Sequence, residues 1–298
     1  MFSQSIPYHS LPRIVLLAIL CATTVATQQP TPDASAAAHL KNANDYARAQ
    51  RWREAIEAYK RAIAIKPDAA NAYSNLGHAY DQLGQLDEAV AALRQANSLQ
   101  PNDSNFKYNL GNVYFKLHRF VESSELLQQA LQLKPDYFEA TNDLGNAYAE
   151  LALYPQAIST LKRAVSLRPD SNLANYNLAV AYYDCGKFKE AIHPLRTAIS
   201  LNKNYEDAYA VLGLVYLNLR RNKAAVEVLE HAVLLAPKDV HAHYHLGIAY
   251  LWIKKKEKFW QEYAVVKSLA LDLAGQMYQA MDSNKLLILA RTNNKPLP

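Results

Sequence analysis

The sequence predicts an all-α repeat protein, built from seven units of 34 residues and closed by a helix that caps the last unit. The first observation behind this prediction is a 34-residue grid of prolines, interrupted only at Lys203: Pro67, Pro101, Pro135, Pro169 and Pro237. The second is composition, because Ala, Leu and Tyr dominate a chain of 298 residues that has only eight glycines. Ala and Leu are good helix formers, whereas turn-rich β architectures need more Gly.

The first 26 residues differ from the rest of the chain. Arg13 precedes the apolar run "IVLLAILCATTVA" (14–26), and no acidic residue comes before it. This pattern is typical of a secretory signal peptide at 1–26, cut after Ala26 and followed by a linker at 27–35. The run is shorter than the roughly 20 residues of a transmembrane helix. We therefore expect export to a periplasm or secretion, with an uncleaved signal anchor as the alternative.

Each unit repeats the same residue types at the same positions when the first unit is counted from Ala36. Position 11 is Tyr in all seven units, and position 7 is Leu in six of them. These two side chains lie one helical turn apart on a single face. Small residues at positions 8, 20 and 27 allow two helices to approach closely.

The phrase "YNLGNVY" (108–114), with the Ala and Pro positions that follow it, resembles the signature of the tetratricopeptide repeat (TPR) family over residues 36 to about 273. The resemblance implies two antiparallel helices per unit, stacked into a right-handed superhelical solenoid with a concave groove. No unit buries its apolar face alone, so the array is one stack with atypical ends. The expected units are 36–69, 70–103, 104–137, 138–171, 172–205, 206–239 and 240–273, the last with a degenerate second helix, before a capping helix and tail at 274–298.

Two local expectations concern the helices of these units. An Asp or Asn after the grid proline is suited to cap the next helix, at Asp68, Asn102, Asp136 and Asp170. Pro194 lies inside the second helix of the fifth unit and is expected to kink or loosen it.

The family resemblance also places a partner-binding groove on one face of the array. In the family, positions 2, 5, 6, 9, 12 and 13 of the first helix face the groove, and here Asn recurs at positions 6 and 9. An Asn amide both donates and accepts, so it can pair with the backbone of an extended peptide. Asn is also common at these positions in the family, which leaves a purely structural role open. The predicted groove residues are Asn44, Asn75, His78, Tyr108, Asn109, Asn112, Asp143, Asn146, Tyr176, Asn177, Tyr183 and Tyr244.

The groove is expected to change character along its length. Units five to seven place apolar residues at the same positions: Val180, Val211, Leu214, Leu217, Ile248, Leu251 and Trp252. An apolar strip of this size is normally covered. The expected cover is either the C-terminal segment, which contains "KLLILAR" (285–291), or the apolar side chains of a partner.

The sequence predicts a binding scaffold and not an enzyme, with no cofactor. It has no glycine-rich phosphate loop and no GxSxG, HExxH or CxxC motif. The alternative function is a binder of a glycan, small molecule or metal in units five to seven, where aromatic rings suit sugars. His241 and His245 share a helical face at a spacing that can hold a metal ion, with Asp207 as a third ligand.

Charge is uneven along the chain, whose formal net charge is +5. Residues 254–298 carry eight Lys or Arg against four acidic residues, whereas residues 27–253 carry 23 of each sign. A nucleic-acid-binding protein would show a basic stripe along its body. We therefore expect one or more protein partners, no nucleic acid, and no stable membrane span after signal cleavage.

Overall fold

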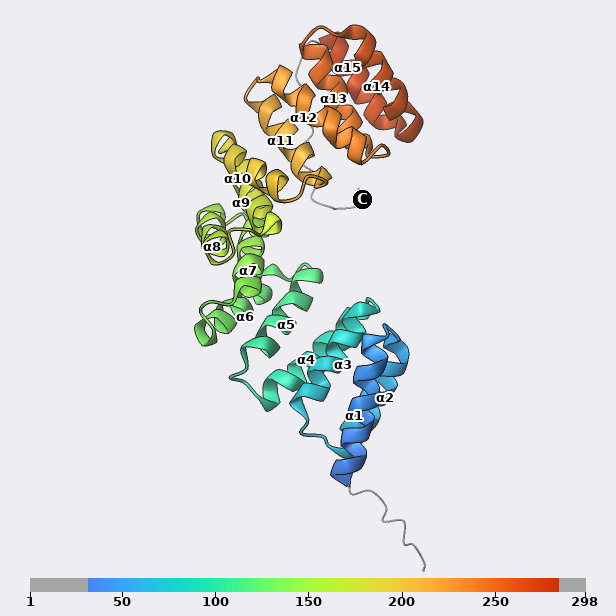
Figure 1. The fold of residues 1–298 in the computed structure, drawn as a ribbon, viewed down its shortest axis with the longest axis vertical. Helices are drawn as coiled ribbons and strands as arrows, with labels where there is room; N and C mark the ends of the chain where they lie inside the picture. The colour runs from blue at the N-terminus through green and yellow to red at the C-terminus, as the bar shows by residue number, and fades with distance from the viewer. Residues whose placement is uncertain (1–31, 284–298) are drawn as a thin grey trace, which may run out of the picture.

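The computed structural model describes residues 32–283, and within them every regular element is an α-helix (Figure 1). The helices are α1 (Pro32–Arg48), α2 (Trp52–Ile65), α3 (Ala70–Gln82), α4 (Leu86–Leu99), α5 (Ser104–Lys116), α6 (Phe120–Leu133), α7 (Phe138–Glu150), α8 (Tyr154–Leu167), α9 (Asn172–Asp184), α10 (Phe188–Leu201), α11 (Glu206–Asn218), α12 (Asn222–Leu235), α13 (Val240–Trp252), α14 (Lys256–Leu269) and α15 (Leu271–Ser283).

The helices form a stack of pairs, from α1 with α2 to α13 with α14, and α15 packs against α13 and α14. Each second helix also packs against the first helix of the next unit, and neighbouring first helices such as α7 and α9 touch. Figure 1 shows the result as an elongated, curved array running from α1 at one end to α15 at the other. The predicted fold class, an all-α superhelical solenoid, is confirmed.

Close packing within a pair depends on the glycine at position 8 of the unit. A Cβ added at Gly145 would lie 2.5 Å from Cγ of Leu161, and one added at Gly77 would lie 2.6 Å from Cγ of Leu93. Both leucines are at most 1% exposed, so neither side chain has room to move away. The first and second helices therefore meet at a distance that only glycine permits at these two positions.

Gly145→Ala is expected to lower the free energy of unfolding by about 1–3 kcal/mol, because overpacking strains the contact with Leu161. Gly275 is the matched control, since a Cβ added there meets nothing within 4 Å. Gly275→Ala should be neutral or slightly stabilising, because Ala has the higher helix propensity. Urea denaturation followed by circular dichroism checks both variants, and an equal loss of stability in the two would contradict the packing argument.

The predicted positions of the helix caps are wrong by one residue. Side chains cap α5, α9 and α13 from Asp103, Ser171 and Asp239, one residue later in the unit than expected. The predicted caps Asp68, Asn102, Asp136 and Asp170 lie in the preceding turns. Each first helix from α3 onwards begins at position 1 of its unit, so the last non-helical residue, which is the one that can cap, is at position 34 of the preceding unit.

Helix α10 runs from Phe188 to Leu201 with Pro194 buried inside it, so the proline removes one backbone hydrogen bond without ending the helix. One further expectation differs from the structure. Helix α1 begins at Pro32, inside the segment 27–35 predicted as a linker. Proline is favoured at the first helical position, and Asp33 in the first turn complements the helix dipole.

The predicted signal peptide at 1–26 and the tail from 284 onwards lie outside the described residues. Among residues 32–283, none of the helices combines the length and the apolar character required to cross a bilayer.

Candidate functional site

The predicted asparagines form a hydrogen-bonded ladder across the first helices of successive units. Three of its bonds run between neighbouring units: Asn75 Nδ2 to Asn44 Oδ1 at 3.3 Å, Asn109 Nδ2 to Ser74 Oγ at 3.2 Å and Asn177 Nδ2 to Asn142 Oδ1 at 3.0 Å. In each case the amide at position 6 donates to a polar side chain of the preceding unit. The ladder therefore joins α1 to α3, α3 to α5 and α7 to α9 on the inner side of the array.

Sequence reasoning missed two members of the ladder. Ser74 and Asn142 occupy position 5, are at most 5% exposed, and accept from the asparagine found 35 residues later. The signal in the sequence was the coincidence of a polar residue at position 5 with an Asn at position 6 of the following unit. These contacts give the asparagines a structural role alongside any role in binding.

Several polar side chains of the ladder region still have donors and acceptors that face the groove. Asn75 and His78 are exposed, and Asn112 and Asn146 are half-buried. An Asn side chain offers two N–H donors and one acceptor oxygen, and each ladder bond uses one donor of its asparagine. His78 is held from the side by the ring of Trp52, with the ring centroids 5.7 Å apart. The inner surface of α3 to α7 can therefore both donate to and accept from a ligand.

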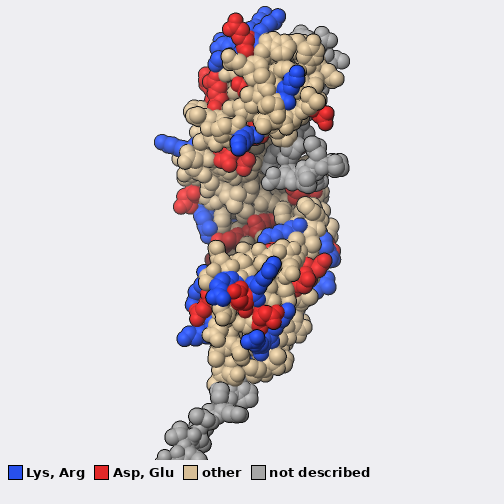
Figure 2. Space-filling model, turned by 90° about the vertical axis from the view of Figure 1, so that its right-hand side faces the viewer, with Lys and Arg blue, Asp and Glu red and all other residues tan. Residues whose placement is uncertain are grey.

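A carboxyl group lies at the α7 end of this polar surface. Asp143 accepts hydrogen bonds from Asn112 Nδ2 at 3.4 Å and Asn142 Nδ2 at 3.2 Å. Burial raises the pKa of the Asp143 carboxyl above its ordinary value, although hydrogen bonds from Asn142, Tyr108 and Asn112 oppose the shift. Burial, together with the nearby Asp143, also raises the pKa of Tyr108. Figure 2 shows acidic side chains inside the hollow near the middle of the molecule.

The raised pKa of Asp143 gives a pH-dependent stability. Between the ordinary value of 3.8 and the raised value, the folded chain binds more protons at this site than the unfolded chain. Stability contributed by this group is therefore present at low pH and lost as the pH rises through the window. Asp143→Asn is expected to make the chain more stable at pH 7 and to leave stability unchanged below about pH 3. Urea unfolding at the two pH values tests this, and a variant that is less stable at pH 7 would contradict it.

Four apolar groove positions of units six and seven, and Tyr244, are closed to solvent, whereas Leu251 and Trp252 are half-buried. Val211, Leu214, Leu217 and Ile248 are 4%, 5%, 0% and 1% exposed, and Tyr244 is fully buried. Burial raises the pKa of Tyr244 to about 12. The expected change of character along the groove is thus present, from polar and open to apolar and buried.

The aromatic groove residues of unit five already touch other rings. The Tyr176 ring lies 5.0 Å from that of Tyr205, and the Tyr183 ring lies 5.4 Å from that of Phe188, measured between centroids. Both tyrosines are half-buried. Their contacts fix the rings at the border between the polar and the apolar parts of the groove.

The three candidate metal ligands are not brought together. Within residues 32–283 the structure has no group of three or more His, Cys, Asp or Glu placed to hold a metal ion, so Asp207 does not complete a site with His241 and His245. Burial and the neighbouring His241 lower the pKa of His245 to about 3, which keeps its imidazole neutral at physiological pH.

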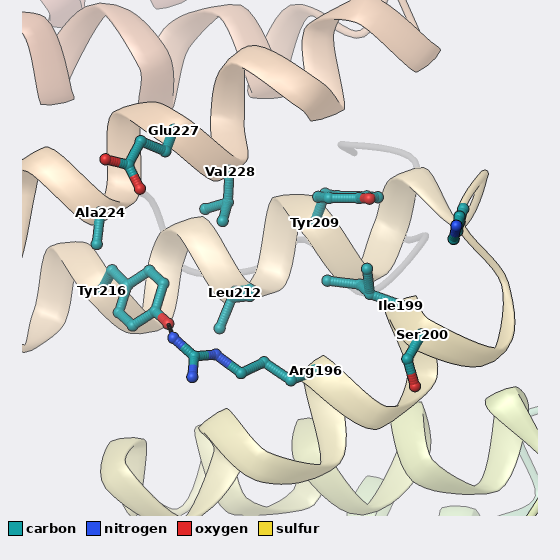
Figure 3. A pocket seen from close by; sticks show the side chains of 10 residues that line it. Arg196, Ile199, Ser200, Tyr209, Leu212, Tyr216, Ala224, Glu227 and Val228 are labelled. Carbon is teal, nitrogen blue, oxygen red and sulfur yellow. Dashed lines mark hydrogen bonds between the residues drawn. The ribbon is translucent and has the colours of Figure 1, made fainter.

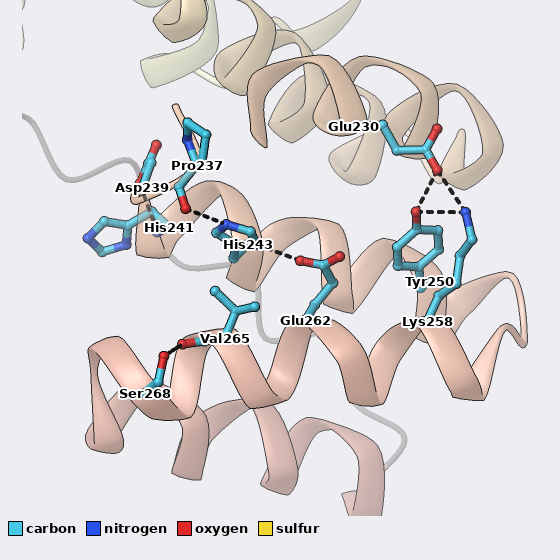
Figure 4. A network of polar contacts seen from close by, with 10 residues as sticks. All are labelled: Glu230, Pro237, Asp239, His241, His243, Tyr250, Lys258, Glu262, Val265 and Ser268. Atoms are coloured by element: carbon cyan, nitrogen blue, oxygen red, sulfur yellow. Dashed lines mark hydrogen bonds and ion pairs between the residues drawn. The ribbon is translucent and has the colours of Figure 1, made fainter. Parts of the chain in front are cut away.

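A buried histidine that sequence reasoning did not single out ties the last pair of helices together (Figure 4). His243 Nδ1 lies 2.6 Å from Glu262 Oε2 on α14, and Nε2 lies 3.1 Å from the carbonyl oxygen of Pro237. A carbonyl only accepts, so Nε2 carries the proton that it donates to Pro237, and the contact between Nδ1 and Glu262 holds a further proton between the ring and the carboxyl group. Asn175, at the same position of unit five, likewise donates to the carbonyl of Pro169 at 3.2 Å. Because the same contact recurs in unit five, we infer that this histidine has a structural role, linking α13 to α14 and to the turn before α13.

A surface cavity of about 380 Å³ lies between α10, α11 and α12, away from the predicted groove positions (Figure 3). Its lining includes Arg196, Tyr209 and Tyr216. Arg196 Nη2 of unit five donates to the Tyr216 hydroxyl of unit six at 2.8 Å, and Arg94 Nε of unit two donates to the Tyr114 hydroxyl of unit three at 2.8 Å. The guanidinium group in the cavity wall thus belongs to a contact between repeats that recurs along the array.

Comparison with protein families agrees with the geometry. The family model described as TPR repeat matches residues 43–84, 77–118 and 181–219, and two models described as tetratricopeptide repeat match residues 104–170 and 206–239. Together these matches cover more than half of the chain. No curated protein matches the sequence significantly.

Solved structures share the fold at low sequence identity. The structure of pilF from Pseudomonas aeruginosa is 20% identical, covers 74% of this chain and 99% of its own, and gives a TM-score of 0.63. PilW, described as a widely conserved type IV pilus biogenesis factor, is 23% identical over 68% of this chain and 94% of its own, with a TM-score of 0.62. YrrB, described as a TPR protein with an unusual peptide-binding site, is 23% identical over 63% of this chain and 96% of its own, with a TM-score of 0.53. At these identities the likeness concerns the fold alone.

Proposed function

Because the chain belongs to the tetratricopeptide repeat family, we propose that it is a protein-interaction scaffold whose inner groove holds an extended segment of a partner protein. The proposal rests on the asparagine ladder, which presents amide groups on an open surface from α3 to α7. Amides of this kind can pair with backbone groups of a peptide whatever its side chains.

The spacing of the ladder suits an extended ligand. Neighbouring packed helices lie about 8–10 Å apart, and an extended chain advances about 3.3 Å per residue. One unit of the array therefore corresponds to about three residues of a bound peptide. Four units, from α1 to α7, offer hydrogen bonds to a segment of about 12 residues, and Asp143 favours a segment with a basic residue or a hydrogen-bond donor at the end that lies on α7.

We place this scaffold in the assembly or secretion machinery of a cell envelope. Two features support that placement: the secretory signal peptide predicted at 1–26, and the fold shared with a pilus biogenesis factor. The partner is one or more proteins of that compartment. Nucleic acid is not expected as a ligand, since basic and acidic residues balance over 27–253 and the excess of basic residues lies at 254–298.

The competing function, binding of a glycan, small molecule or metal in units five to seven, has less support. Tyr244 is fully buried, and the rings of Tyr176 and Tyr183 already pack against other rings. A sugar would have to displace these contacts in order to stack.

The decisive experiment is affinity capture from an envelope extract with residues 27–298, followed by mapping of the bound segment and measurement of its affinity by calorimetry. Binding of a synthetic peptide of the mapped segment, with contacts located on α3 to α7, supports the proposal. Capture that depends on folded partner surfaces, with no peptide able to compete, would contradict it.

A further inference from the structure

The two halves of the inner face differ in exposure at identical repeat positions. Asn75 and Val211 both occupy position 6, and His78 and Ile248 both occupy position 9. The first member of each pair is exposed, whereas Val211 is 4% and Ile248 is 1% exposed. The apolar strip on α11 and α13 is therefore covered, although equivalent positions on α3 are open to water.

The groove positions from α7 to α13 carry acidic side chains and no basic ones. On α7, α9, α11 and α13 these positions contain no Lys or Arg. Their acidic residues are Glu139, Asp143, Glu150, Asp184 and Asp207. Glu139 is paired with Arg168 from the second helix of its own unit, at 3.0 Å. From α13 towards α7, the surface thus passes from an apolar strip to an acidic region.

The end of the chain has complementary chemistry in the same order. Helix α15 ends at Ser283 and packs against α13, and 15 residues follow it, "NKLLILARTNNKPLP". After Asn284 and Lys285 they contain an apolar run at 286–289, continue with Arg291 and Lys295, and include no acidic residue. A segment leaving α15 in this order would bring its apolar run to α13 and α11 first and Arg291 and Lys295 to α9 next.

The length of this segment is sufficient. Fifteen residues span at most about 50 Å when extended, and three neighbouring first helices cover about 24–30 Å. We propose that residues 285–295 lie in cis along the inner face from α13 to α9, with residues 286–289 on the apolar strip and Arg291 and Lys295 against Asp184, where the acidic region begins. The chain fills the C-terminal part of its own groove and leaves the inner face of α1 to α7 open to a partner.

Photo-crosslinking in the full chain tests this placement. A benzophenone amino acid replaces Ile288, and the control carries it at Leu234, which is 73% exposed on α12. We expect the probe at 288 to form links within one molecule to peptides of α11 or α13, and the control probe to form none there. Links from 288 that join two copies would assign the strip to a second molecule, and links elsewhere or none would also overturn the proposal.

A second measurement uses a variant outside the described helices, so that loss of the fold cannot account for the result. Leu287→Asp/Ile288→Asp should uncover the strip and raise the fluorescence of the apolar dye ANS about twofold or more. Leu297→Asp is the control, because it lies beyond the proposed contact. Unchanged fluorescence in the double variant would refute the proposal. Neither measurement involves a partner, so the outcome is independent of whether the asparagine ladder binds a peptide.

Discussion

Replacement of Asn75, Asn109, Asn112 and Asn146 by Ala is expected to weaken binding of the partner segment about tenfold or more. Each amide that pairs with the peptide backbone contributes about 0.5–1.5 kcal/mol net, and 1.4 kcal/mol corresponds to a factor of ten in affinity. Calorimetry with the mapped segment measures the effect.

The ladder bonds require a control, because Asn109 and Asn112 also bind neighbouring helices. Asn146→Ala alone is the cleaner variant, since the described residues show no hydrogen bond from its side chain that would be lost. Urea denaturation separates lost stability from lost affinity. Full affinity in a quadruple variant that remains folded would remove the ladder from the binding site.

His243→Leu is expected to cause the largest loss of stability, about 3–5 kcal/mol. The substitution leaves Glu262, whose side chain is only 15% exposed, without the imidazole that lies 2.6 Å from it. An uncompensated buried charge costs much more than the net contribution of the pair itself. The loss should appear in urea denaturation and, by hydrogen exchange, should be concentrated in α13 to α15, because the pair joins α13 to α14 and α15 packs against both.

The double variant His243→Leu/Glu262→Leu distinguishes a charge effect from a packing effect. It removes both members of the pair, so it should recover most of the stability that the single variant loses. Arg48→Ala is the surface control, because the Arg48–Asp45 pair is 79% and 52% exposed and should contribute less than about 1 kcal/mol. A double variant as unstable as His243→Leu would indicate that the ring acts by packing alone.

Much of the candidate site could be predicted from the sequence because its residues recur on the 34-residue grid. The position of Asn75 or Asn109 in the unit determines the helix face on which it lies, since 3.6 residues make one turn. The hydrogen-bond partners could not be predicted in the same way. Asn177 reaches Asn142 across 35 residues, whereas Asn112 reaches Asp143 across 31, and the choice depends on how one unit is rotated against the next.

The sequence by itself determined the number of units, the identity of their first and second helices, and the faces that these helices bury. Those features follow from local periodicity. Tyr at position 11, small residues at position 8 and a proline at position 32 can be recognised from the sequence without knowing which helices pack together. Only the tertiary structure decided the contact of His243 with Glu262 and the cap at Asp103 in place of Asn102. It also decided that Val211 is buried whereas Asn75, at the same position of another unit, is exposed. Each of these depends on the distance between side chains of different helices, which is set by the close packing and the superhelical curvature of the whole stack.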